Sequence, residues 1–309
     1  MPQSCAELKT EYERLKTLKE AFVLEYAKID EASDLVKVKK LKKELESFRK
    51  EFKDRLVVSL ERAREIMGEN YYGPEEIEDA LGFRVSELEI PPIPYSHEAL
   101  KQAEKLGEKL IFRVSHDEDG NPLTMKRINE LGQIRIGDES GKFLYYTDSC
   151  KDEDFYKNSP LRTEWKLVGG SLIENSTGKN YIGQTRVLRN YLKSINCLSA
   201  EEEIECSDER LDEIDKIMHK DLQEAVKLLI NLKINRNHRR SPAEIIYDWF
   251  LQFKKTKHRG FLRDNNEWSN VCSSNGGLVE FGRVDVGGGF VTWWLPFHLR
   301  DDLGVVSVR

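Results

Sequence analysis

The chain ends in GGGFVTWWLPFHLRDDLGVVSVR, residues 287–309, where aromatic and leucine side chains stand between glycines and charged residues. A disordered tail would lack these aromatic residues, and a half-buried strand would alternate apolar and polar positions throughout. This stretch alternates only in part. Because glycine and turn-forming residues continue back to Gly260 without a helical period, residues 260–309 predict short strands joined by turns.

The segment before this ending carries the spacing of helices. Apolar residues recur every three or four positions over residues 179–192 and 211–232, and RRSPAEIIYDWFLQF, residues 239–253, repeats the pattern. Within it, Ser241 and Pro242 are typical of the first positions of a helix. TEWKLVG, residues 163–169, predicts a strand. Residues 155–309 are therefore predicted to form an α+β domain.

Residues 4–67 contain neither glycine nor proline, and their apolar residues recur in steps of three, four and seven. This spacing places one apolar stripe on each of two long helices. Ala32-Ser33-Asp34 predicts the break between them, so the pair would form an antiparallel hairpin that resembles a coiled coil. We interpret residues 1–67 as a structural arm, through which the chain could also self-associate.

Residues 68–154 predict a small α+β unit of their own. Short helices are expected over 74–80, 96–106 and 124–131, each supported by a proline, serine or glycine at one of its ends. KLIFRV, residues 109–114, and KFLYYT, residues 142–147, predict strands. The sequence of this unit discloses no function.

Composition sets outer limits on the function. Of the 309 residues, 39% are hydrophobic, which is enough for a core in each half of the chain. A net charge of −6 argues against a dedicated nucleic-acid-binding protein. No apolar run predicts a signal peptide or a membrane span. The cysteines lack any metal-like spacing, which predicts reduced thiols in the cytoplasm; they are Cys5, Cys150, Cys197, Cys206 and Cys272.

Known catalytic motifs are not matched. Gly178-Lys179 lacks the upstream glycine of a phosphate-binding loop, and Asn180 replaces its serine or threonine. The histidines form no HExxH pair, and no GxSxG is present to supply a serine nucleophile. We therefore predict no catalytic residue, no metal site and no cofactor.

Two basic clusters, residues 233–240 and 254–259, keep a nucleic-acid-associated role open as an alternative. They flank a helix with aromatic residues, and basic residues interleaved with aromatics can hold nucleic acid through phosphate contacts and stacking. However, Ile245, Trp249 and Phe253 fit one buried helix face. The clusters are then the solvated ends of that helix, and nucleic acid is not the expected partner.

The order of elements from Thr163 onward resembles the bacterial C-type-lectin-like fold of the formylglycine-generating-enzyme type. That family has a helix with R-x-P-S/T-x-x-E, then a strand with Trp-Ser-Ser, and a last strand with G-F/V-x-x-x-R. Arg240, Pro242 and Glu244 stand in for the first element, with Glu244 close to the expected place of its glutamate. Trp268, Ser273 and Ser274 stand for the second element, and Gly304, Val305 and Arg309 for the third. Ala243 stands where the family has Ser or Thr.

The resemblance implies the scaffold without its known sites. Formylglycine-generating enzymes need two cysteines in the late strands, and this sequence has only Cys272 there. An oxidase that uses Cys272 is therefore the alternative from the enzyme class. The calcium motifs Glu-Pro-Asn and Trp-Asn-Asp of vertebrate lectins do not occur in the sequence. Trp294 is followed by Leu295 and not by an acidic calcium ligand.

Members of this fold that are neither enzymes nor calcium lectins include the variable proteins of diversity-generating retroelements. The whole chain is also similar to proteins from small-genome candidate-phylum bacteria. The resemblance implies a non-enzymatic recognition protein that binds a protein or glycan ligand through a hypervariable carboxy-terminal face. Residues expected to point outward are Phe281, Arg283, Val284, Val286, Phe290, Thr292, Trp293, Leu295, Phe297, His298, Leu299 and Arg300. Expected framework residues are Gly276, Gly277, Leu278, Val279, Gly282, Gly288, Val291, Trp294, Pro296, Leu303 and Gly304.

Overall fold

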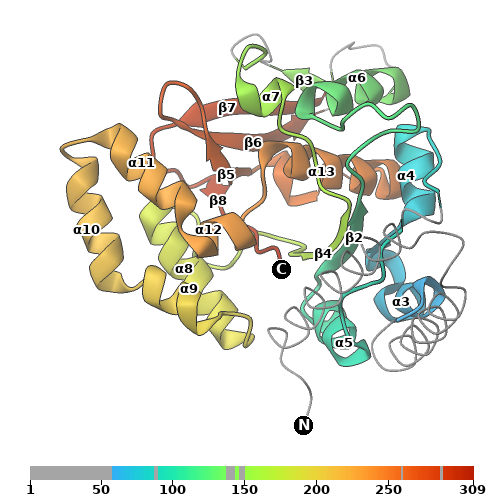
Figure 1. Ribbon diagram of the computed structural model, residues 1–309, viewed down its shortest axis with the longest axis horizontal. Coiled ribbons are helices and arrows are strands. Elements are labelled where there is room, and N and C mark those ends of the chain that lie inside the picture. Colours follow the sequence, from blue (N-terminus) through green and yellow to red (C-terminus); the bar gives the residue numbers. More distant parts are fainter. Residues whose placement is uncertain (1–57, 87–89, 137–142, 146–149, 259, 286–287) are drawn as a thin grey trace, which may run out of the picture. The chain divides into compact units, whose positions relative to one another are not determined.

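The structure is a computed structural model, and it describes residues 58–86, 90–136, 143–145, 150–258, 260–285 and 288–309 (Figure 1). The chain divides into two compact units, residues 1–68 with 92–102 and residues 69–91 with 103–309. Residues 1–57, which hold most of the predicted pair of long helices, lie outside the described residues. The self-association expected of these helices therefore stays a prediction. Helices and mixed sheets together confirm the α+β class.

The described part of the first unit contains helix α3, Leu60–Met67, and the beginning of α5, His97–Lys105. Ser59 caps α3 by accepting a hydrogen bond from the Arg62 amide at 3.1 Å. An isolated antiparallel bridge joins Val58 to Ile93, and both residues are buried.

A three-stranded sheet in the second unit has the order β1 (Tyr71–Tyr72), β2 (Lys109–Arg113) and β4 (Glu164–Val168). Strand β1 runs parallel to β2, and β4 runs antiparallel to it. Phe112 and Trp165 face each other across the β2–β4 pair and stack with ring centroids 4.9 Å apart. Cross-strand aromatic pairs of this kind stabilise the pairing of the two strands.

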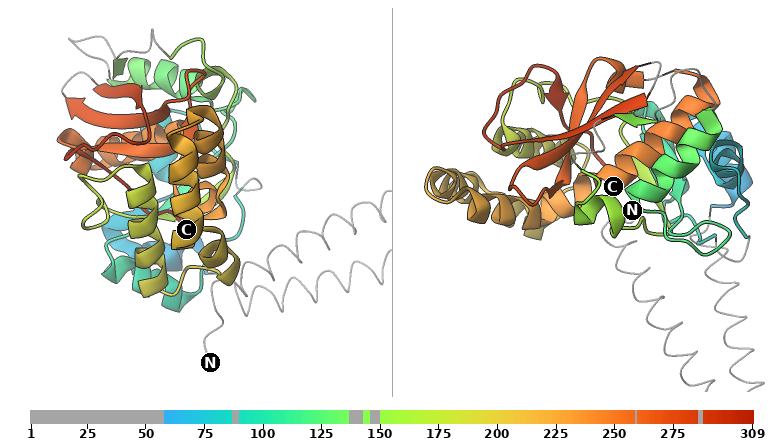
Figure 2. Two further views of the ribbon diagram at one scale, coloured as in Figure 1. Left: turned by 90° about the vertical axis from the view of Figure 1, so that its left-hand side faces the viewer. Right: turned by 90° about the horizontal axis from the view of Figure 1, so that it is seen from above.

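A five-stranded sheet holds the glycine-rich ending of the chain. Its order is β3 (Leu144–Tyr145), β7 (Gly288–Trp294), β6 (Leu278–Asp285), β5 (Asn266–Cys272) and β8 (Leu303–Gly304). Figure 2 shows its red strands from two further sides. The prediction of short strands after Gly260 is confirmed. Since β3 belongs to residues 68–154, this segment contributes strands to both sheets of the second unit.

Helices surround these strands (Figure 1). Their bounds are α4 Pro74–Leu81, α6 Met125–Ile136, α7 Asp154–Lys157, α8 Tyr181–Ser194, α9 Ala200–Glu205, α10 Asp208–Met218, α11 Leu222–Asn231, α12 Lys233–His238 and α13 Pro242–Thr256. The single helix predicted over 211–232 is wrong: α10 ends at Met218, and Asp221 caps a new helix by accepting from the Glu224 amide at 3.0 Å. Among the described residues no helix is long and apolar enough to cross a membrane.

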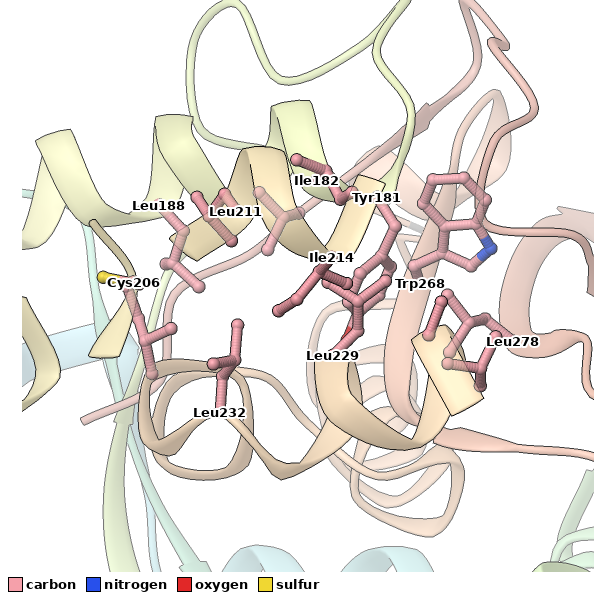
Figure 3. Packing of buried hydrophobic residues seen from close by; sticks show 14 of the residues in the cluster. Tyr181, Ile182, Leu188, Cys206, Leu211, Ile214, Leu229, Leu232, Trp268 and Leu278 are labelled. Carbon is pink, nitrogen blue, oxygen red and sulfur yellow. The ribbon is translucent and has the colours of Figure 1, made fainter. Parts of the chain in front are cut away.

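A large hydrophobic core lies between the helices α8–α12 and the five-stranded sheet (Figure 3). Leu188, Leu211, Ile214 and Leu229 supply the helical side of this core and are fully buried. Trp268 of β5 is fully buried on the sheet side of this core, and its ring meets the Tyr181 ring edge-on at a centroid distance of 5.5 Å. Burial of large aromatic side chains contributes strongly to stability.

Buried ion pairs join α13 to both sheets. The Arg113 guanidinium on β2 donates to Asp248 at 3.0 and 2.6 Å. Arg240 also donates to Asp248, at 2.9 Å, and pairs with both oxygens of Glu267 on β5. All four side chains are at most 2% exposed. The network therefore fixes α13 against β2 and β5 at the same time.

The last residues connect the two sheets. The Gly169 amide donates to the Ser307 carbonyl and the Arg309 amide to the Leu167 carbonyl, both at 2.9 Å. The Arg309 side chain pairs with Glu108, and the Nη2–Oε2 distance is 2.6 Å. This carboxy-terminal segment therefore extends the pairing of β4 toward β8.

The buried carboxylate of Glu202 on α9 makes the stability of the fold depend on pH. Glu202 accepts a hydrogen bond from the His238 ring at 3.1 Å, and the other ring nitrogen contacts the Val308 carbonyl at 2.8 Å. Burial raises the pKa of Glu202, but hydrogen bonds from His238 and Asn237 outweigh it and hold that pKa well below its usual range. The ionised form is thus the one that the folded state stabilises.

We expect Glu202→Gln to lower the free energy of unfolding by about 2 kcal/mol at pH 7, because a hydrogen bond to a charged group is lost. A depressed pKa contributes stability above the unfolded pKa of about 4.3, and that contribution is lost as pH falls toward the folded pKa. The difference between the two proteins should therefore shrink below about pH 4.3. Thermal unfolding of both proteins from pH 7 to pH 3 measures it, and a difference independent of pH would contradict the assignment.

Candidate functional site

Strand β7 presents two different faces. Phe290, Thr292 and Trp294 share one face because side chains alternate along a strand. The residues opposite them on β6 are Gly282, Glu280 and Leu278, respectively. Leu278 and Trp268 continue this face into the hydrophobic core (Figure 3). Beyond that core, the face carries Phe290, Thr292 and Trp294, which are half-buried or exposed.

The other face of the sheet packs toward α13. Phe281 is fully buried and lies against Trp249 of that helix, with ring centroids 5.8 Å apart. Val284 is also buried. The expectation that Phe281 and Val284 point outward is therefore wrong, because α13 covers the side of β6 from which Phe281 projects.

The loop of residues 295–302 follows β7 and is held by its backbone. The Pro296 carbonyl accepts from the Tyr181 amide at the start of α8, and the Arg300 carbonyl accepts from the Gly178 amide, both at 2.9 Å. The Asn266 amide donates to the Asp302 carbonyl at 2.6 Å. These contacts tie the loop to α8 and β5, so the side chains of the loop stand on a fixed backbone.

Aromatic, apolar and arginine side chains gather on this loop and the adjoining strand face. Trp294 is 38% exposed, Phe297 44% and Leu299 67%. The His298 ring lies edge-on to Trp294 at 5.3 Å and to Phe297 at 4.9 Å. We call this set the C-terminal patch. It comprises Arg283, Phe290, Thr292, Trp294, Phe297, His298, Leu299 and Arg300.

Arg300 connects the patch to two carboxylates beneath it. Its Nη1 donates to Glu280 Oε1 at 2.7 Å, and its Nε and Nη2 donate to Asp302 at 2.9 and 2.7 Å. The same guanidinium lies 5.0 Å from the centroid of the Trp294 ring, which is a cation–π distance. Arg300 is therefore held in one orientation by Glu280, Asp302 and Trp294.

Arg283 joins the patch from a bulge in β6. The register between β6 and β7 shifts between Gly282 and Asp285, and Arg283 has a φ of 46°, in the left-handed region. A bulge of this kind re-aims a side chain. Here the Arg283 side chain is 59% exposed and donates to Asp302 Oδ2 at 3.2 and 2.7 Å.

The two carboxylates differ in their ionisation. Burial raises the pKa of Glu280 to about 7, and Arg300 opposes that rise only in part. For Asp302 burial also favours the neutral form, but hydrogen bonds from Arg300 and Arg283 hold its pKa below the usual range. Asp302 is thus ionised at neutral pH, whereas Glu280 titrates close to it.

Unsatisfied polar atoms accumulate under the patch. Glu280 Oε2, Trp268 Nε1, Asn266 Oδ1 and His298 Nδ1 are buried without a hydrogen-bond partner among the described residues. Glu280 and Trp268 are direct cross-strand neighbours. A polar contact with the Trp294 side chain lowers the pKa of Glu280 and so favours its ionised form, although burial outweighs this effect. Unpaired buried polar groups are uncommon and call for an explanation.

The expected binding residues are brought together only in part. Trp293 pairs with Val279, whose side chain points to the α13 side of the sheet. The Trp293 ring packs against Gly277, in the space that a larger side chain there would occupy, so Trp293 lies away from the patch. Leu295 is half-buried after the strand, and Val286 lies outside the described residues. Trp294 was expected to be framework and is exposed instead. Strict alternation along β7 groups it with Phe290 and Thr292 and would have found it.

Cys272, on which the oxidase alternative depends, lies at the end of β5. Burial raises the pKa of its thiol, so the reactive thiolate is disfavoured at neutral pH. The cysteines of the described chain are all free thiols. In the same part of the chain, no three His, Cys, Asp or Glu side chains are grouped to hold a metal ion.

The basic clusters are largely engaged inside the protein. Arg239 and Arg240 are 1% exposed, and His238 contacts Glu202. Lys233 forms ion pairs with Glu201 and Glu205. In the second cluster, Lys255 donates to the Tyr71 carbonyl at 2.7 Å. These contacts favour a structural role over contacts with phosphates. The interpretation of the first cluster as a solvated helix end is wrong for Arg239 and Arg240, because they lie in the interior.

The C-terminal patch is thus the place where exposed aromatic and charged groups meet a rigid support. Comparisons of the chain with protein-family models, with curated proteins and with solved structures found no match, so the interpretation of this patch depends on its own geometry.

Proposed function

We propose that the chain is a non-enzymatic recognition protein that binds a protein or glycan ligand through the C-terminal patch. The single observation that carries this proposal is the exposure of Trp294, Phe297 and Leu299 beside an arginine fixed by two carboxylates. Tryptophan and arginine are enriched among the residues that dominate binding energies. Because Arg300 is already held in place, binding would cost little side-chain entropy.

The proposal includes a C-type-lectin-like scaffold of the kind used by variable proteins of diversity-generating retroelements. Several residues on which the resemblance depends make buried contacts that hold the domain together, as framework residues of such a scaffold would. Arg240 joins α13 to β5, Trp268 fills the core, and Arg309 pairs with Glu108. The hypervariable positions would then be the side chains of the patch that no buried contact constrains.

The variable-protein part of the proposal has a test at the level of the gene. A diversity-generating system places an imperfect copy of the 3′ end of the gene nearby, with differences mainly at adenines, and a reverse transcriptase gene beside it. Both should be found next to the gene for this chain. If the surrounding DNA holds neither, the patch can still bind a ligand but is not diversified.

The patch itself is tested by Trp294→Ala and Phe297→Ala. We expect each to weaken binding of a selected ligand about 30-fold, because truncating an interface hot spot costs about 2 kcal/mol. The ligand is taken from a displayed library of random twelve-residue peptides or from an array of oligosaccharides, and affinity is measured by surface plasmon resonance.

A matched control is Ile204→Ala, because Ile204 is a large apolar residue of α9 that is 74% exposed outside the patch. Its affinity should equal that of the wild type. Equal losses in all three variants, or no loss in the two patch variants, would refute the assignment of the binding face.

A further inference from the structure

We propose that the ligand of the C-terminal patch is an acidic segment of a protein partner, in which a carboxylate lies beside an apolar side chain, and that Arg283 and Arg300 bind the carboxylate. The inference rests on the proposed function, since it names the chemistry of the ligand for the same face. Three independent features of the described residues support it: the donors of the two arginines, the apolar side chains next to them and the backbone of Arg283.

The two guanidinium groups converge on one carboxylate and still have donors to offer. Arg300 uses one hydrogen of each of its nitrogens on Glu280 and Asp302, so two of its five N–H groups have no partner among the described residues. Arg283 directs Nε and Nη2 to Asp302, and its Nη1 has no described partner. Arginine pairs with free donors recognise planar carboxylates well.

The apolar part of the ligand has an adjoining contact surface. Trp294 lies against the Arg300 guanidinium, and His298 links Trp294 to Phe297 through ring contacts. Arg283, Arg300, Trp294 and Phe297 thus form a continuous series through Asp302 and His298. A peptide that places Asp or Glu next to Leu or Phe presents a carboxylate and an apolar group side by side, as this series requires.

The backbone of Arg283 points to a role outside the fold. A left-handed conformation disfavours residues other than glycine, and residues in such sparsely populated conformations cluster at ligand-binding and active sites. The only described contact of the side chain is an exposed ion pair with Asp302, which contributes little to stability. Recognition of an anionic ligand would explain why an arginine stands at this left-handed position, whereas the exposed contact with Asp302 does not.

The charge of the patch also favours an anion when Glu280 is neutral. The charged groups that face Glu280 are Arg300 and Asp302, and its neutral neighbours are Trp268 and Trp294. Asp301 is exposed and lies beside Gly178. Two arginines and Asp302 leave one net positive charge when Glu280 is protonated and none when it is ionised. Since burial raises the pKa of Glu280 to about 7, an acidic ligand should bind more tightly at pH 6 than at pH 8.

The test selects twelve-residue peptides from a random displayed library on the full chain and compares each selected peptide with a copy in which Asn and Gln replace Asp and Glu. We expect selected peptides to be enriched in acidic residues next to apolar ones, and the neutral copies to bind at least about tenfold more weakly, one factor of ten for each 1.4 kcal/mol. Arg283→Gln should cause a similar loss for the acidic peptide and none for its neutral copy. Arg210→Gln, an exposed arginine of α10 paired with Glu213, is the matched control and should change neither.

A second variant separates recognition from folding. Arg283→Gly suits the left-handed backbone, so its Tm should equal or exceed that of the wild type while its affinity for the acidic peptide falls. Glu280→Gln, which can still accept from Arg300, should abolish the difference between pH 6 and pH 8. A difference between pH 6 and pH 8 that survives in Glu280→Gln would overturn the role of Glu280 in the pH effect.

The outcomes distinguish this inference from the proposed function. Selected peptides without acidic enrichment, or neutral copies that bind equally well, overturn the acidic ligand and leave the binding face intact. Binding to oligosaccharides on an array but to no peptide overturns the protein partner alone. Binding to neither probe contradicts the proposed function itself.

Discussion

Replacing Arg240 by methionine is expected to lower the free energy of unfolding by about 3–5 kcal/mol, because it leaves the buried carboxylate of Glu267 without its cation. Glu267 loses the ion pair described for it, whereas Asp248 keeps Arg113. Burial already raises the pKa of Glu267 against the opposing effect of Arg240. Removal of Arg240 therefore favours protonation of Glu267 or opening of the contact between α13 and β5.

Chemical denaturation followed by circular dichroism measures this loss. The double variant Arg240→Met, Glu267→Leu should recover much of the stability, because an apolar pair can replace a buried ion pair at little cost. Arg210→Met is the control, since its ion pair with Glu213 is exposed and should contribute less than about 1 kcal/mol. If Arg240→Met were no less stable than Arg210→Met, the buried network would not hold α13 in place.

Trp268→Ala is expected to lower the free energy of unfolding by about 3–5 kcal/mol, because it removes a fully buried aromatic side chain from the core. The variant would leave a cavity between Tyr181 of α8 and Leu278 of β6 (Figure 3). Since Glu280 is the cross-strand neighbour of Trp268, the support of the patch should weaken together with the core.

Trp268→Phe is the matched variant. It keeps an aromatic ring against Tyr181, and the indole Nε1 that it removes has no hydrogen-bond partner among the described residues. Its loss of stability should therefore stay well below that of alanine. Equal losses in the two variants, measured by thermal unfolding, would show that an unseen hydrogen bond to the indole matters more than packing.

Much of the secondary structure could be predicted from local patterns. Ser241, Pro242 and the apolar spacing of residues 239–253 predict α13, which spans Pro242–Thr256. Capping and periodicity act within a few residues, so they can be read along the chain. The apolar spacing continues across Asp221 and so does not predict the break there. Asp221 followed by Glu224 is nevertheless a local helix-start pattern, and it is the signal that could have located the break.

The candidate site was less accessible to sequence reasoning. Arg283, Phe297, His298 and Arg300 were expected to face outward and belong to the patch, whereas Phe281 is buried by α13. Glu280 and Asp302 were not among the predicted residues. A glutamate between Val279 and Phe281 suggests a solvated position, but Glu280 is 1% exposed and pairs with Arg300 from the loop of residues 295–302.

By itself, the sequence determined the α+β class, the placement of most helices and the gathering of short strands at the carboxy-terminal end. These features depend on interactions between residues close in the chain. The tertiary structure decided which side of each strand is covered, because that depends on α13 and α8 from elsewhere in the sequence. It also decided that Arg283 donates to the same Asp302 carboxylate as Arg300, because Arg283 lies 19 positions before Asp302 and no local pattern links residues at that separation.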